Sequence, residues 1–315
     1  MRWSSSAAVA LLVGLILTVE VEAQTGEASF DSVNTFKPEP IAFAKIAVPI
    51  HPAVAPSPGG RFFAVLQVRP DPVLWVVPGD GGEPIAYRKM WAAYMPRWAP
   101  SGNRIGFVAG FGPPRIWTIE VDPASGRPVD PPRMLYRAEV NAYAFSPDGE
   151  WIAFVPRRST AKGASEIYII EWETRKVRFL LRESGLIYRL DWAPDGAHIY
   201  YGLAPDAIDD PVHRVVRASV RGGSRATVME TGEYLGLAPD GVSILHRPND
   251  FEAIRVGALE IASRNGEPLL RIAVPRGVSP TWGASSAYLV QVRANEAGDE
   301  IVAIPSPLLW PWFGR

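Results

Sequence analysis

The sequence contains no cysteine. A disulfide, a thiolate metal site, a thiol nucleophile and a lipid-modified cysteine are therefore all excluded. Lysine is also scarce: the 32 basic residues are nearly all arginines, and 33 acidic residues bring the net charge to −1. A nucleic-acid-binding protein would need an excess of positive charge to neutralise phosphates. The composition, with 47% hydrophobic residues, therefore favours a globular fold and argues against a nucleic-acid partner.

The apolar run near the N-terminus, Ala7–Val19, falls short of the roughly 20 residues that a membrane-spanning helix needs. A short segment with Arg2 precedes it, and small residues up to Ala23 follow it. These three parts are typical of a secretory signal peptide cleaved after Ala23, and they predict a periplasmic or other extracytoplasmic location. A retained membrane anchor is the alternative, since Trp3–Val21 would span a bilayer with tilt or thinning. Residues 24–38 are polar and irregular and are expected to form a linker.

One short phrase recurs along the chain and is clearest at Phe145–Gly149, which reads FSPDG. Its proline presets φ, its aspartate tolerates a tight turn, and its glycine supplies a positive φ. Related phrases occupy residues 57–60, 98–102, 192–196 and 237–241, with a degenerate sixth copy at residues 282–286. The proline position steps by 42, 47, 47, 45 and 45 residues. This period is typical of the four-stranded blades of a β-propeller.

Alternating apolar segments such as Glu166–Trp172 and Val177–Arg182 lie between the turns and predict further strands. No long apolar stripe of helical period follows the leader, so we predict an all-β fold, a six-bladed propeller over residues 39–304. The last unit shows only three convincing strands, ending at Glu300–Ile304. We therefore expect Ile41–Val48 to complete the sixth blade and close the ring, which would remove exposed sheet edges.

The phrase, followed by an aliphatic and aromatic strand, resembles the repeat of TolB-like six-bladed propellers across residues 39–304. The resemblance implies the propeller fold. Similar blades occur in periplasmic scaffold proteins and in the propeller domains of prolyl-oligopeptidase-type enzymes. TolB carries an additional α/β domain before its propeller. This chain has only about 15 residues of linker there, so its resemblance does not imply the role of TolB in envelope integrity.

Catalytic motifs are not found. The sequence has no Gly-x-Ser-x-Gly nucleophile elbow, and its four histidines, His51, His198, His213 and His246, lack the spacing of a metal site. We expect single solvent-facing or hydrogen-bonded histidines, no catalytic residue and no cofactor. The turn aspartates Asp148, Asp195 and Asp240 are predicted to bond their own backbone and to be structural.

A weak candidate for a metal site is the acidic insertion Ala204–Pro211. Asp206, Asp209 and Asp210 offer oxygen ligands at a spacing that could hold Ca²⁺. The segment lacks the glycine and the terminal glutamate of a known calcium loop. A solvated acidic loop is therefore the expected interpretation.

Two segments are candidates for partner binding. The tail Pro305–Arg315 carries three prolines that exclude a regular strand, and it contains the cluster Leu309, Trp310, Trp312 and Phe313. It either packs over the propeller as an apolar plug or serves as a docking peptide or membrane-interface anchor. The loop Arg157–Ser165, with Arg157 and Arg158, is a candidate for an anionic partner.

The predicted innermost strands are mostly small or aromatic, with Arg97, Asn141 and Asp191 as the only strong polar groups. Three polar groups offer little for general acid–base catalysis. The sequence therefore favours a non-catalytic exported propeller, a scaffold subunit that docks on an envelope or membrane-associated protein complex. The alternative is an enzyme or small-ligand binder that uses the central channel.

Overall fold

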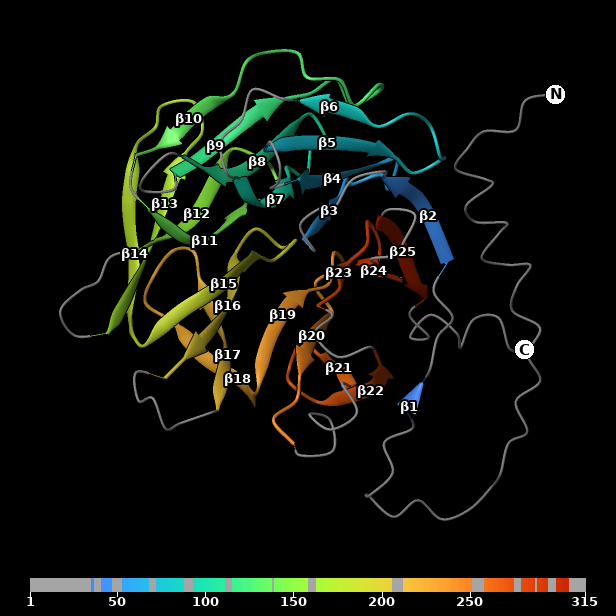
Figure 1. The fold of residues 1–315 in the computed structure, drawn as a ribbon. Helices are drawn as coiled ribbons and strands as arrows, with labels where there is room; N and C mark the ends of the chain where they lie inside the picture. Colours follow the sequence, from blue (N-terminus) through green and yellow to red (C-terminus); the bar gives the residue numbers. More distant parts are fainter. Residues whose placement is uncertain are drawn as a thin grey trace. The chain divides into compact units, whose positions relative to one another are not determined.

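The computed structural model describes residues 35–36, 41–46, 53–67, 72–87, 93–110, 115–137, 139–157, 163–205, 212–250, 258–274, 279–286, 288–293 and 299–305. All of them lie in one compact unit, Thr35–Arg315. The regular elements in these ranges are 25 β-strands (Figure 1). No helix in the described ranges is long and apolar enough to cross a membrane.

The strands form six sheets, and in each sheet consecutive strands pair as antiparallel neighbours. The first sheet contains β3 (Val54–Pro56), β4 (Phe62–Gln67), β5 (Val73–Pro78) and β6 (Ile85–Tyr87). The second contains β7 (Ala93–Trp98), β8 (Arg104–Ala109), β9 (Arg115–Glu120) and β10 (Arg133–Tyr136). The third contains β11 (Val140–Phe145), β12 (Trp151–Pro156), β13 (Ala164–Glu171) and β14 (Val177–Ser184).

The fourth sheet contains β15 (Leu186–Trp192), β16 (His198–Ala204), β17 (His213–Ser219) and β18 (Arg225–Thr231). The fifth contains β19 (Glu233–Leu237), β20 (Ser243–Arg247), β21 (Ala258–Ser263) and β22 (Pro268–Ala273), with β1 (Thr35–Phe36) at its edge. The sixth contains β23 (Thr281–Trp282), β24 (Tyr288–Arg293), β25 (Asp299–Pro305) and β2 (Ile41–Ile46). The predicted all-β fold of six blades is confirmed.

The hydrophobic core lies between neighbouring sheets. Because successive side chains of a strand point to opposite faces, each blade packs against the blade before it and the blade after it. Val54 belongs to a cluster shared with the sixth sheet, whereas Ala55 belongs to one shared with the second. Four more clusters join sheets two to three, three to four, four to five and five to six. Strands buried on both faces explain why β4 is apolar along most of its length.

The repeated turns have the local structure that the sequence predicts. The Asp148 carboxylate accepts the N–H of Glu150 at 2.9 Å. Gly149 adopts φ +75°, a left-handed conformation that favours glycine. Asp195 accepts the N–H of Ala197 at 2.8 Å, and Asp240 accepts the N–H of Val242 at 2.9 Å. The structural role of the three turn aspartates is confirmed.

The sixth sheet combines the two ends of the propeller sequence. β2 pairs antiparallel with β25, from Ile41 opposite Ala303 to Ile46 opposite Asp299. This is the outer position that the sequence assigned to Ile41–Val48. That this pairing closes the ring, and how much it stabilises the fold, stays a prediction.

The strand β1 was not predicted, because its residues fall in the expected linker, 24–38. It pairs parallel with β22, with Thr35 opposite Arg271 and Phe36 opposite Ile272. The outer edge of β22 offers unpaired backbone groups to any extended segment that reaches it. Two residues are too short for an alternating pattern, so the sequence carries no signal for this strand. The fifth sheet consequently has five strands.

Candidate functional site: the central channel

The first strands of the six sheets line one cavity of about 740 Å³. These lining segments are β3, β7, β11, β15, β19 and the segment around β23, one from each repeated unit. The volume falls in the range of small-molecule sites, roughly 300–1,000 Å³. Much of the wall is apolar, including Val54, Met95, Ala144 and Leu235. The charged groups come from β7, β15 and β19.

The strongest polar contact in the channel joins Arg97 of β7 to Asp191 of β15. The Arg97 guanidinium donates to the Asp191 carboxylate at 2.7 Å and to the carbonyl oxygen of Leu190 at 3.0 Å. Its centre also lies 6.0 Å from the ring centroid of Tyr143. Burial alone would lower the pKa of Arg97, but the Asp191 carboxylate offsets this effect and the pKa lies above its ordinary value. Arg97 is therefore a fixed cation.

Asp191 is an ionised carboxylate enclosed by cations. Burial alone would raise its pKa, but Arg189 and Arg97 together hold the pKa below its ordinary value. Its second oxygen lies 3.5 Å from Nε of Arg189 and accepts the N–H of Leu237 at 3.4 Å. Two guanidinium groups against one carboxylate leave this cluster with a net positive charge.

Arg189 makes fewer polar contacts with the protein than Arg97 does. Its buried Nε makes the 3.5 Å contact with Asp191 but donates no hydrogen bond to the part of the chain that the structure describes. Its guanidinium lies against Gly236, where an added Cβ would stand 3.0 Å from Nη2 of Arg189. The glycine therefore leaves the space that Arg189 occupies.

Irregular backbone shapes the inner strands that carry these side chains. Register shifts interrupt the pairing of β7, β11, β15 and β19 with the next strand of each sheet. The pairings of β3 and β23 have no shift, and these strands place no charged or amide side chain in the cavity. In β7 the irregularity includes Met95, a non-glycine residue at φ +56°. Bulges re-aim side chains, and strained residues concentrate at functional sites.

Buried tyrosines support the wall as neutral hydrogen-bonding groups. The Tyr143 hydroxyl donates to the carbonyl oxygen of the strained Met95 at 2.7 Å. The Tyr188 hydroxyl accepts the N–H of Tyr234 at 2.7 Å, and burial raises the pKa of Tyr188 to about 12. Burial also raises the pKa of Tyr143 and, together with the Asp191 charge, that of Tyr234. These hydroxyls therefore stay protonated at neutral pH.

The structure confirms that Arg97, Asn141 and Asp191 line the channel. The prediction that they are its only strong polar groups is wrong, because Arg189 and Glu233 line it as well. Arg189 stands two residues before Asp191, so strand alternation placed both on one face, and this signal was available. Glu233 precedes the segment predicted as the innermost strand. Its carboxylate accepts from Nε of Arg247 at 3.3 Å.

The described histidines make hydrogen bonds, as predicted. His198 contacts Asp195 at 2.8 Å, and His213 contacts the Tyr188 hydroxyl at 3.3 Å. His246 is buried and contacts Thr231 at 2.8 Å, with Glu260 at 3.4 Å. Among the described residues, no group of three or more histidines and carboxylates could hold a metal ion.

Most predicted partner-binding and metal residues lie outside the described ranges. These are Arg158, Leu309, Trp310, Trp312, Phe313, Asp206, Asp209 and Asp210, and His51 joins them. Arg157 is described: its side chain is exposed, with Nε 3.7 Å from the Glu139 carboxylate. The structure does not bring Arg157 to the channel lining.

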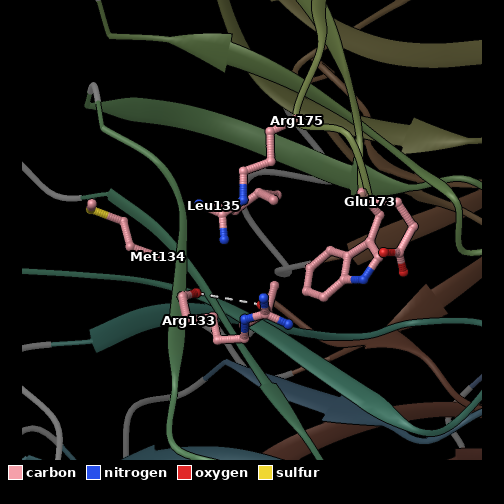
Figure 2. A pocket seen from close by; sticks show the side chains of 7 residues that line it. Arg133, Met134, Leu135, Glu173 and Arg175 are labelled. Atoms are coloured by element: carbon pink, nitrogen blue, oxygen red, sulfur yellow. Dashed lines mark hydrogen bonds between the residues drawn. The ribbon is translucent and has the colours of Figure 1, made fainter.

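A second cavity lies between β9, β10 and the turn after β13 (Figure 2). Its seven lining residues are Thr118, Arg133, Met134, Leu135, Trp172, Glu173 and Arg175. The volume, about 30 Å³, is small and suits a water molecule rather than an organic ligand. Trp172 is also covered by the Arg104 guanidinium, 3.7 Å from its ring centroid. This cavity is therefore part of the packing between the second and third sheets.

Solved structures with the same architecture include two TolB proteins. TolB from Acinetobacter baumannii is 20% identical, with a TM-score of 0.57, and the match covers 80% of this chain and 62% of that one. The putative TolB from Agrobacterium tumefaciens is 15% identical, also at 0.57, covering 82% and 90% of the two chains. The fold is that of a TolB-like six-bladed propeller.

Hydrazine synthase from Kuenenia stuttgartiensis shares the architecture at 14% identity and a TM-score of 0.52, over 80% of this chain and 82% of that one. At such identities the likeness is one of fold. The chain described here also spans only 62% of the length of the Acinetobacter TolB chain. No protein-family model and no curated protein sequence matches it.

Proposed function

We propose that this chain is a non-catalytic, extracytoplasmic propeller that acts as an interaction subunit of an envelope or membrane-associated protein complex. The TolB-like fold supports this role, since blades of this kind occur in periplasmic scaffold proteins. The signal-like segment Ala7–Val19 supports the location. The near-neutral charge of the chain argues against nucleic acid as the partner.

The observation that carries the non-catalytic part is the pairing of the channel carboxylates. Asp191 is bonded to Arg97 at 2.7 Å, and Glu233 accepts from Arg247 at 3.3 Å. A general base needs a free carboxylate or an imidazole whose pKa lies near the working pH. No histidine is among the described residues that line the cavity. The channel is therefore better suited to binding than to proton transfer.

The contact surface that we propose is the aromatic tail, with Leu309, Trp310, Trp312 and Phe313, and the loop around Arg157 and Arg158. Aromatic rings and arginine are enriched where proteins meet partners. The same tail, or a retained leader, would also bring the propeller to a membrane surface.

The experiment compares co-purification from detergent-solubilised membranes for the full chain and for a chain truncated after Pro305. We expect the truncated protein to lose its partner in the complex while its melting temperature stays the same. Phe179→Ser is the matched control, because Phe179 is an aromatic residue exposed on β14 far along the sequence from the tail. It should retain the partner. A lower melting temperature with unchanged partners would instead make the tail an apolar plug.

A further inference from the structure

We infer that the central channel is a binding site for a small organic carboxylate, with Arg189 as the residue that recognises its charge. This inference goes beyond the interaction role proposed above and does not depend on it. The site consists of Arg97, Asp191 and Arg189 and of a mostly apolar remaining wall that also carries Asn141 and Glu233.

The contacts of the two arginines indicate which of them is available to bind a ligand. Arg97 already donates to Asp191 and to the carbonyl oxygen of Leu190, at 2.7 and 3.0 Å. Asp191 also accepts the N–H of Leu237, at 3.4 Å. Arg189 reaches this carboxylate only at 3.5 Å. Arg189 can therefore turn to a ligand without leaving Asp191 unpaired, because Arg97 keeps it ionised and bonded.

The charge of the cluster selects the sign of the ligand. Glu233 also lines the cavity, but its carboxylate is paired with Arg247 at 3.3 Å. Arg97 and Arg189 against Asp191 then leave a single net positive charge in the cluster, which one carboxylate would neutralise. A guanidinium presents two parallel N–H groups that match the two oxygens of a carboxylate. The side chain of Arg189 is 29% exposed, so a ligand in the channel can reach it without unfolding the wall.

The backbone around Arg189 is arranged to keep this side chain in place. The pairing of β15 shifts register between Ile187 and Arg189, and that of β19 shifts between Tyr234 and Gly236. A Cβ at Gly236 would come within 3.0 Å of the guanidinium. The same kind of shift occurs on β7 and β11, so it is shared by the inner strands that place charged or amide side chains in the cavity.

The remainder of the cavity fits an organic body rather than an inorganic anion. Its volume is about 740 Å³, far larger than a free phosphate requires. Met95, Tyr188 and Trp192 line the cavity and are only partly buried, so they provide apolar surface for such a body. We therefore expect ligands that combine a carboxylate with an aromatic or aliphatic group.

The test uses two probes of nearly the same size and shape, indole-3-acetate and the neutral indole-3-acetamide, titrated calorimetrically into the purified protein. We expect the acetate to bind about tenfold or more tightly than the amide, as a charge-assisted bidentate contact would give. Arg189→Gln should remove this preference, and Arg189→Lys should restore part of it. Arg221→Gln, at an exposed hairpin residue outside the channel, should leave both affinities unchanged.

Three results would overturn the inference: no measurable binding of indole-3-acetate, equal affinity for the two probes, or an undiminished preference in Arg189→Gln. A melting curve of each variant separates lost binding from lost folding. If Arg189→Gln unfolds, Arg189→Lys provides the second variant, since it keeps the charge but lacks the guanidinium fork that matches a carboxylate. That variant should weaken acetate binding, and unchanged binding would count against the site.

Discussion

Arg97 and Asp191 are 94 residues apart in the sequence and meet at 2.7 Å in the channel. The contact links the inner strand of the second blade to that of the fourth, past the third blade between them. Their side chains are 23% and 12% exposed, so the pair is shielded from solvent more than most surface ion pairs. We therefore infer that the pair is a tie across the ring, that is, an ion pair that stabilises the ring by linking two blades that are not neighbours.

Removing the carboxylate should destabilise the propeller. Asp191→Asn leaves Arg97 and Arg189 facing each other without a counter-charge, and breaking a buried pair in this way costs about 3 kcal/mol of unfolding free energy. Urea denaturation measures the change. Arg214→Gln is the control, since Arg214 pairs with Glu230 at 3.6 Å and both side chains are exposed. It should cost less than about 1 kcal/mol. Equal effects of the two substitutions would contradict the tie.

The same pair predicts a dependence of stability on pH. The pKa of Asp191 is lower in the folded protein than in the unfolded chain. Its contribution is therefore present above the unfolded value, about 4, and is lost as the pH falls through the folded value. Below about pH 4 the difference in stability between the protein and Asp191→Asn should shrink. A difference that stays constant from neutral to acidic pH would show that the charge of Asp191 does not matter.

The repeated turn depends on a left-handed glycine. In Gly149→Ala the new Cβ meets only Ser101 Oγ, at 3.7 Å, so the cost comes from the backbone at φ +75°. We expect a loss of about 1 kcal/mol. Gly59→Ala is the matched control, because Gly59 lies in the corresponding turn of the first blade with open space around it and is not at positive φ. Its melting temperature should be unchanged.

Closure of the ring by β2 is tested by deletion. Removing residues 39–48 takes away the partner of β25 and exposes that strand as an edge. We expect aggregation or loss of the cooperative unfolding transition. Removing residues 24–33, which leaves β1 and β2 in the chain, should have little effect. A monomeric, cooperatively folding protein without residues 39–48 would show that the ring closes without this strand.

The sequence was informative wherever a physical rule acts locally. The Pro-Asp-Gly phrase predicted the turns at Asp148 and Gly149, its six copies predicted the number of blades, and its period predicted four strands in each blade. It was silent on β1, because pairing of two residues with an edge depends on tertiary proximity alone. The sequence identified Arg97 and Asp191 as polar residues of the channel but did not predict their contact. The repeat places both residues on inner strands and does not indicate which inner strands exchange an ion pair. Arg189 was missed although alternation placed it beside Asp191.

The mass of the native assembly tests whether the chain is a subunit of a protein complex. The chain itself is 34.4 kDa, and native mass measurement on protein released from its own membranes with mild detergent reports what it carries. We predict a complex with a stoichiometric partner protein. The double substitution Trp310→Ser and Trp312→Ser should reduce it to the free chain without changing the melting temperature. Recovery of the unmodified protein only as a free monomer would contradict this prediction.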